Sequence, residues 1–173
     1  MNEQFAEIAK FHGHKCPGLA MGYRMTKAAM KQLAESSAVD EELVAIVEND
    51  ACGVDALQWL TGCTFGKGNF IFKDYGKQVY TLFSRNSGKG ARVHFRDGDV
   101  PEAARSSKQD MIDWILAADE KDVVDAKEVS LKPPPKAQVY KSIKCNSCNE
   151  GVMETRIQKV DGSNLCIPCA QKQ

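Results

Sequence analysis

The sequence has no long hydrophobic run and no net charge. No segment approaches the roughly eighteen consecutive apolar residues that a membrane-spanning helix needs. Lys and Arg number 23, as do Asp and Glu, so no general attraction to nucleic acid or to an anionic membrane follows. Residues 1–10 mix charged and apolar side chains in an amphipathic pattern, unlike the apolar core of a signal peptide. We therefore expect a soluble cytoplasmic protein with no membrane contact.

Histidine is scarce, yet two of the three histidines lie with Cys16 in the segment 12–18. Neutral imidazole and thiolate together suit a zinc-like metal ion. Pro17 and the apolar residues spaced three and four apart after it predict a helix over residues 17–36. Cys16 would then lie at a helix N-terminus, where a lowered thiol pKa is expected. The alternative is a reduced, half-buried cysteine beside two solvated histidines.

A second cysteine repeats this arrangement. The apolar run Leu43–Val47 predicts a buried strand, which leads through Cys52 into a helix over residues 53–61 that ends at Gly62. The two cysteines can converge if the two helices pack side by side. Asp55 falls in the first turn of the second helix, where a carboxylate fits either a role in the site or simple stabilisation of the helix end.

The glycine-rich loop 62–69 contains Cys63 and Lys67 but lacks the Walker A spacing. A loop that brings backbone close to a ligand or another segment is therefore expected. Strands are predicted at 69–73, 78–85 and 92–96, joined as consecutive antiparallel hairpins, and then a helix over 106–118 and a strand over 122–131. His94 alternates with apolar neighbours, which fits a half-exposed sheet histidine better than a metal ligand.

These elements predict an α+β core whose helices pack on a mainly antiparallel sheet. The prolines at 133–135 favour an extended spacer, because neither a helix nor a central strand accommodates them. We place the core in residues 1–132, a Pro-rich linker in 133–143 and a small module in 144–173. A treble-clef finger is expected in this module.

The module carries two C-x-x-C pairs separated by seventeen residues, and these pairs comprise Cys145, Cys148, Cys166 and Cys169. Four thiolates at this spacing suit one tetrahedral zinc ion. Roughly thirty residues bury too little apolar surface to fold unaided, so the metal would supply the folding free energy. Four protein ligands close the coordination shell, which predicts a structural and not a catalytic ion. Its basic residues make nucleic acid a weak candidate partner.

Three segments, 11–18, 48–55 and 61–69, resemble in this order the FmdE family, named after one of the components of molybdenum formylmethanofuran dehydrogenase. The resemblance covers roughly residues 5–130, and the four-cysteine tail is similar to a finger that some members carry. It implies a homodimer with a metal site in the core. The implied ligands are His14, Cys16 and Cys52; His12, Asp55 and Cys63 would bind the ion or support its ligands, and Lys67 would contact a substrate or anion.

Two classes of function follow. In the first, a core ion of zinc, nickel or iron with an open position acts in redox or metal-assisted chemistry on a small substrate. The resemblance makes this an oxidoreductase related to formylmethanofuran dehydrogenase, with catalytic residues drawn from Cys16, Cys52, Cys63, Asp55 and Lys67. In the second, the chain is a non-catalytic accessory protein whose finger docks to an oxidoreductase complex or to nucleic acid. Metal storage or delivery is a third possibility.

Overall fold

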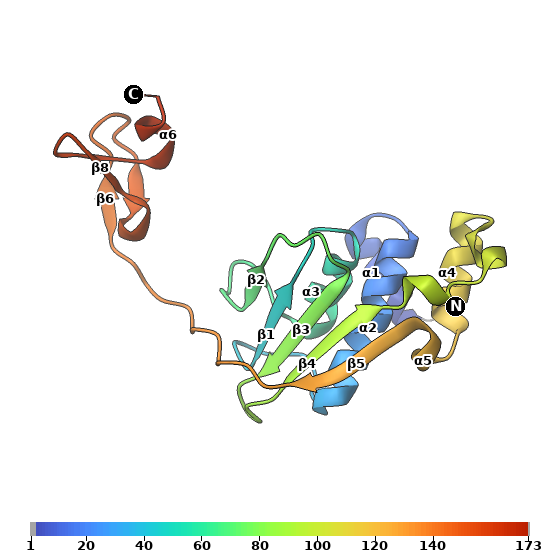
Figure 1. The fold of residues 1–173 in the computed structure, drawn as a ribbon. Helices are drawn as coiled ribbons and strands as arrows, with labels where there is room; N and C mark the ends of the chain where they lie inside the picture. Colours follow the sequence, from blue (N-terminus) through green and yellow to red (C-terminus); the bar gives the residue numbers. More distant parts are fainter. Residues whose placement is uncertain (1–2, 173) are drawn as a thin grey trace. The chain divides into compact units, whose positions relative to one another are not determined.

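The computed structural model describes residues 3–172, and the chain divides into two compact units (Figure 1). We call Met1–Lys136 the core unit and Ala137–Gln173 the finger unit, and describe each by itself. The first two residues of the helix predicted at the N-terminus lie outside the described residues. No helix within 3–172 is long and apolar enough to cross a bilayer.

The core unit is an α+β domain, as predicted, with helices packed on one mainly antiparallel sheet. The sheet has the strand order β2-β1-β3-β4-β5, and only the pair β1–β2 is parallel. Its strands are β1 (Leu43–Val47), β2 (Phe70–Phe72), β3 (Val79–Ser84), β4 (Gly90–Phe95) and β5 (Val124–Val129). Its helices are α1 (Glu3–His12), α2 (Pro17–Leu33), α3 (Gly53–Thr61), α4 (Lys108–Ala117) and α5 (Glu120–Val123), with 3-10 turns η1 (Asp97–Asp99) and η2 (Glu102–Arg105).

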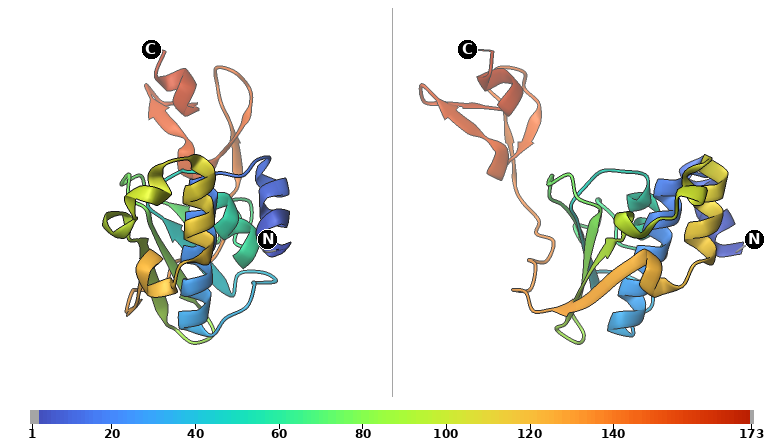
Figure 2. Two further views of the ribbon diagram at one scale, coloured as in Figure 1. Left: turned by 90° about the vertical axis from the view of Figure 1, so that its right-hand side faces the viewer. Right: turned by 45° about the vertical axis from the view of Figure 1, so that its right-hand side comes forward.

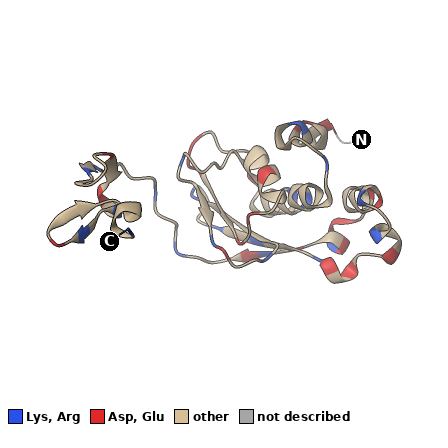
Figure 3. Cartoon of the chain, turned by 90° about the horizontal axis from the view of Figure 1, so that it is seen from above, with Lys and Arg blue, Asp and Glu red and all other residues tan. Residues whose placement is uncertain are grey.

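Helices α2, α3 and α4 cover one face of the sheet (Figures 2 and 3). Helix α2 is central, because it contacts α3 and α4 and also lies against β3, β4 and β5. Helix α1 packs on α3 and α2. The hydrophobic core fills the space between this helical layer and the sheet, and β3 is buried along its whole length, as expected for the central strand.

Local backbone geometry ends the first three helices. Gly13, with φ +96°, follows α1, and its N–H donates to the carbonyl of Ala9. Gly62, with φ +69°, ends α3 where the sequence predicts it. Helix α2 ends at Leu33, three residues before the predicted Ser36, because Ala34 adopts the left-handed conformation and its N–H bonds back into the last turn.

The predicted hairpin between strands 69–73 and 78–85 is wrong. Strand β2 pairs in parallel with β1, with Phe70 opposite Ala45, and so occupies the edge of the sheet. The reason is the path of the loop 62–69: the Asn69 amide donates to the carbonyls of Asp40 and Leu43, each at 3.0 Å. This anchor returns the chain to the beginning of β1, so β1, α3 and β2 form a βαβ unit. The hairpin between β3 and β4 is confirmed.

The Pro-rich segment lies against the face of the sheet that carries no helix. Pro134 is buried, and the Arg85 guanidinium donates to the carbonyls of Pro134 at 2.8 Å and Pro135 at 3.0 Å. A cavity of 750 Å³ lies between this segment and the side chains of Ile46 and Ile71. Residues 133–135 therefore contact the core unit, which extends to Lys136.

The finger unit consists of two hairpins and a short helix. Strands β6 (Ser142–Lys144) and β7 (Gly151–Met153) form the first hairpin, followed by the 3-10 turn η3 (Glu154–Arg156). Strands β8 (Gln158–Val160) and β9 (Ser163–Leu165) form the second, and α6 (Ile167–Ala170) begins after Cys166. The small buried cluster consists of Cys145, Leu165 and Cys166, with a few half-buried neighbours.

Candidate metal centre

Four residues of the core unit bring potential metal ligands together: His12, His14, Cys16 and Cys52. One ligand atom from each lies within 4.8 Å of the other three. His12 is the last residue of α1, His14 lies in the loop after Gly13, and Cys16 and Cys52 immediately precede α2 and α3. Three helix ends therefore meet at one point and supply two imidazoles and two thiols, a donor set that suits zinc and related ions.

Glycines allow the two helices to approach closely enough for this. A Cβ atom on Gly22 would lie 2.1 Å from the Gly53 carbonyl oxygen, so α2 and α3 are in backbone contact here. One turn earlier, a Cβ atom on Gly18 would lie 3.5 Å from the Cys52 Cβ. The spacing of Gly18 and Gly22 places both on the α3 side of α2. This close contact brings the N-terminal ends of α2 and α3, and with them Cys16 and Cys52, together.

Asp55 fixes the orientation of His12. Its Oδ2 lies 2.7 Å from His12 Nδ1, so the carboxylate accepts the Nδ1–H and leaves Nε2 as the free nitrogen. Nε2 is buried and has no hydrogen-bond partner in the described structure. A buried polar atom without a partner is costly, and a carboxylate on the opposite ring nitrogen is the usual support for a metal-binding histidine. The residues present therefore fit a metal ion.

The thiol of Cys16 does not have the lowered pKa predicted for a helix N-terminus. Burial raises its pKa, and so does the neighbouring Cys52. The Leu19 N–H, 3.4 Å from the Cys16 Sγ, lowers it without offsetting these effects. The prediction considered the helix end and not the second thiol. A bound dication would reverse this balance, because it stabilises thiolates directly.

Tyr80 on β3 lies beneath the centre and was missed by the sequence analysis. A Cβ atom on Gly53 would lie 2.5 Å from the Tyr80 hydroxyl oxygen, which is buried and has no hydrogen-bond partner in the described structure. Burial raises the pKa of Tyr80 strongly, and the nearby Cys52 and Asp55 raise it further. No local sequence pattern distinguishes this tyrosine from the other buried residues of its strand.

A cavity of 350 Å³ borders the cluster. His12, Cys52 and Asp55 form one wall, and Phe65, Phe70, Phe72, Asn49 and Asp50 are among the other lining residues. Side chains alternate along a strand, so Phe70 and Phe72 share the face of β2 that borders this cavity. Because Cys52 and His12 line it, a small molecule in the cavity would contact two of the four cluster residues.

Cys63 and Lys67 lie apart from the cluster. Cys63 follows the C-terminal end of α3, and Cys52 precedes its N-terminus; nine helical residues separate the two ends by about 13 Å. The buried Cys63 thiol donates to the Leu43 carbonyl at 3.4 Å, and burial raises its pKa. Lys67 is half-buried and does not line the cavity. His94 Nδ1 instead lies 3.5 Å from Oδ2 of Asp125 on β5.

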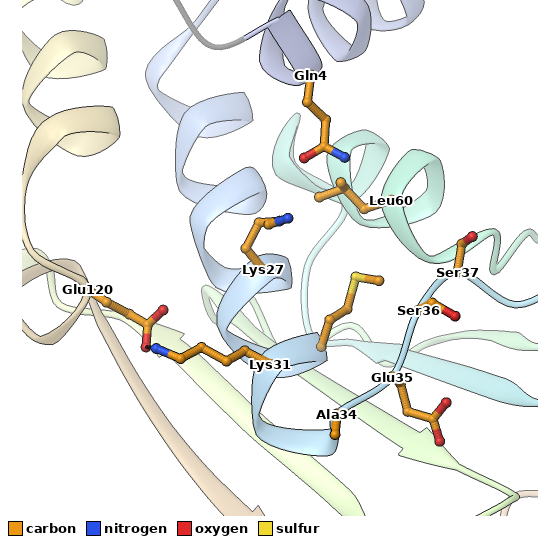
Figure 4. Close-up of a pocket in the computed structure, with 10 residues that line it drawn as sticks. Gln4, Lys27, Lys31, Ala34, Glu35, Ser36, Ser37, Leu60 and Glu120 are labelled. Atoms are coloured by element: carbon orange, nitrogen blue, oxygen red, sulfur yellow. Dashed lines mark hydrogen bonds and ion pairs between the residues drawn. The ribbon is translucent and has the colours of Figure 1, made fainter.

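A second cavity, of 590 Å³, lies near the C-terminal end of α2 (Figure 4). Its walls carry both charge signs: Lys27, Lys31, Glu35 and Glu120 line it, and Lys31 Nζ lies 3.0 Å from Glu120 Oε1. None of the four cluster residues is among its described lining residues. This cavity is therefore separate from the candidate metal centre.

The finger unit holds a second cluster, formed by Cys145, Cys148, Cys166 and Cys169. Their sulfur atoms all lie within 4.8 Å of one another. Backbone N–H groups, first that of Cys148 and then that of Cys166, lower the pKa of Cys145 to about 6. The Cys166 N–H donates to the Cys145 Sγ at 3.3 Å. Four sulfurs with such backbone donors are typical of a closed structural zinc site.

Fold and clusters together define a metal-binding α+β protein with a C-terminal four-cysteine zinc finger. Comparison with protein families identifies both parts. Residues 11–146 match the model described as "FmdE, Molybdenum formylmethanofuran dehydrogenase operon", and residues 139–173 match the "Prokaryotic dksA/traR C4-type zinc finger". The first match covers more than half of the chain. The chain therefore belongs to the FmdE family.

Two relatives illustrate this membership. A crystal structure of an FmdE-like protein of tungsten formylmethanofuran dehydrogenase type from Syntrophus aciditrophicus is 27% identical, with a TM-score of 0.77 over 99% of this chain and 92% of that one. An Archaeoglobus fulgidus protein, described as a probable S-adenosyl-L-methionine-binding protein, is 30% identical over 93% of this chain. The chain spans 50% of that protein, so the description concerns a molecule about twice as long.

Proposed function

We propose that the core unit binds a transition-metal ion and uses it in redox or metal-assisted chemistry on a small substrate. The observation that carries this proposal is the Nε2 atom of His12, which is buried, unpartnered in the described structure and oriented by Asp55. It belongs to a cluster of two imidazoles and two thiols that borders a cavity. Purely structural support of the fold would not require a cavity next to the ion.

The four cluster residues differ in how firmly the fold holds them. His12, Cys16 and Cys52 are half-buried at helix ends, and Asp55 holds the His12 ring in place. His14 is exposed and lies in a loop. His12, Cys16 and Cys52 would thus be the permanent ligands, and His14 the fourth ligand that substrate displaces. When bound, the ion would supply Lewis acidity or an electron-transfer centre, and soft ligands of this kind accept zinc, nickel or iron.

Cys52 is the thiol that a substrate can reach. It lines the cavity, whereas Cys16 is not among the described lining residues. Asp55 also lines the cavity, so its second oxygen could accept a proton or hydrogen bond from a bound molecule while Oδ2 holds His12. Cys63 and Lys67 have no part in this proposal, since neither borders the cavity.

The experiment is a titration of the cobalt-substituted full chain with imidazole, followed by absorption spectroscopy. If His14 is displaceable, imidazole changes the d–d bands of the core ion. The finger contributes a constant background because its four thiolates leave no free position. The same titration of the Cys52→Ser variant should lose the response. A spectrum that imidazole leaves unchanged would show that the core site is closed and would argue for a structural ion.

The second candidate function is that of an accessory protein which docks through the finger unit. The finger has its own buried cluster and its own cysteine site, and it matches a separate family. Removing residues 137–173 tests this, because residues 133–135 pack on the core and must stay. Loss of a co-purifying oxidoreductase partner, with the core metal retained, supports docking; undiminished co-purification contradicts it. Light scattering on both proteins also tests the homodimer implied by the family.

A further inference from the structure

The cavity beside the metal centre has a marked chemical bias. Phe65, Phe70 and Phe72 supply three aromatic rings, and Phe65 and Phe72 remain 76% and 42% exposed. Exposed phenylalanines gathered around one cavity suggest a ligand that covers them, because scattered single residues are the commoner pattern on a surface. Phe65 lies in the loop 62–69 and the other two on the edge strand β2.

The charged groups around this cavity all have the same sign. Asp50 and Asp55 line it, and among the described lining residues there is no Lys or Arg. Lys73, the next charged residue after β2, lines the cavity on the opposite face of the sheet. A dication held by two thiolates is neutral overall, so the two carboxylates set the electrostatic potential with or without the ion. A carboxylate or phosphate ligand would be repelled here.

We infer that the cavity formed by Phe65, Phe70, Phe72 and Asp50 binds an organic cation, an ammonium or sulfonium group attached to an apolar or aromatic body. Aromatic faces attract such cations, and the nearby carboxylates strengthen the attraction. Cys52 and His12 form the inner wall, so the apolar body on the rings would place the ligand beside the metal centre. This inference rests on the proposed core site and names the class of substrate for it.

The test compares three probes of similar size: benzyltrimethylammonium, benzyl alcohol and benzoate. Binding to the metal-loaded full chain is measured by isothermal titration calorimetry. Benzyltrimethylammonium has no lone pair and cannot ligate a metal, so its binding reports on the cavity alone. We expect it to bind about tenfold more tightly than benzyl alcohol, and benzoate to bind most weakly.

Three variants localise the effect. Phe65→Ala and Phe72→Ala should each weaken binding of the cation several-fold, and Asp50→Asn should reduce its preference over benzyl alcohol. Tyr75→Ala is the matched control, because Tyr75 is 60% exposed near the same strand but is not among the described lining residues. Benzoate binding as tightly as the cation, or a cation affinity that Phe65→Ala leaves unchanged, would overturn the inference.

The result is distinguishable from failure of the proposed function. The same calorimetric series is repeated after the metal has been removed by a chelator. A cation preference that persists without metal supports the cavity assignment even if imidazole leaves the cobalt spectrum unchanged. A responsive cobalt spectrum with no cation preference overturns the cavity assignment and leaves the metal proposal intact.

Discussion

The Nδ1 atom of His12 lies 2.7 Å from Oδ2 of Asp55, although the two residues are 43 positions apart in the sequence. This contact joins the end of α1 to the first turn of α3. It determines which nitrogen of His12 faces the cluster, and the buried Nε2 then has no partner within the described protein. Asp55 therefore does more than stabilise a helix end.

Replacing Asp55 should weaken the core metal site without unfolding the protein. In Asp55→Asn the amide no longer fixes the imidazole as a carboxylate does, and we expect the affinity for the core ion to fall about 10- to 100-fold. Competition with a chromophoric chelator measures this affinity. Asp125→Asn is the matched control, since Asp125 pairs with His94 outside the cluster. An Asp55→Asn protein with unchanged affinity would refute the orienting role.

The contact between Gly22 and Gly53 makes a second prediction. In Gly22→Ala the new methyl group would overlap the Gly53 backbone, so α2 and α3 must separate. We expect a loss of about 1–3 kcal/mol in the free energy of unfolding, measured by urea denaturation of the metal-free protein, and a lower core metal content. Gly18→Ala serves as the control because its added Cβ has ordinary contact distances. Equal stability of the two variants would contradict the close-packing argument.

Local signals in the sequence predicted most of the helices and the separate finger. Pro17 and Gly62 mark helix ends by their own backbone preferences, which tertiary contacts rarely override. The parallel pairing of β2 was not predictable in this way, because it depends on where Asn69 anchors the loop. The partnership of His12 with Asp55 and the position of Tyr80 likewise arise only when α1, α3 and β3 have packed. The spacing of Gly18 and Gly22 was the one unused local sign that α2 has a close neighbour.

Tyr80→Phe separates stability from function. The Tyr80 hydroxyl is buried without a partner in the described structure, so removing it should raise the stability of the metal-free protein by about 1 kcal/mol. If the hydroxyl serves the neighbouring Cys52 thiolate once metal is bound, the same change shifts the sulfur-to-cobalt absorption band. Tyr23→Phe is the comparison: its hydroxyl donates to Gln4, so stability should fall slightly. Destabilisation of metal-free Tyr80→Phe would show that the hydroxyl has a partner there.

The finger unit should depend on its metal far more than the core unit does. Among its described residues the buried cluster is Cys145, Leu165 and Cys166, too little apolar surface to fold alone. Chelation should therefore abolish amide hydrogen-exchange protection in residues 142–170 while β3, at the centre of the core sheet, stays protected. Cys148→Ser should have the same effect without a chelator. Persistent protection of the finger after complete metal removal would contradict this dependence.

Metal stoichiometry tests the central claim most directly. Mass spectrometry of the intact protein under native conditions counts the ions bound to each variant, and we predict two per chain for the unmodified protein. Cys16→Ser and Cys52→Ser should each retain one ion, bound in the finger, whereas Cys63→Ala should retain both because its thiol lies outside the cluster. Two tightly bound ions in Cys16→Ser and Cys52→Ser would show that the converging helix ends do not hold a metal.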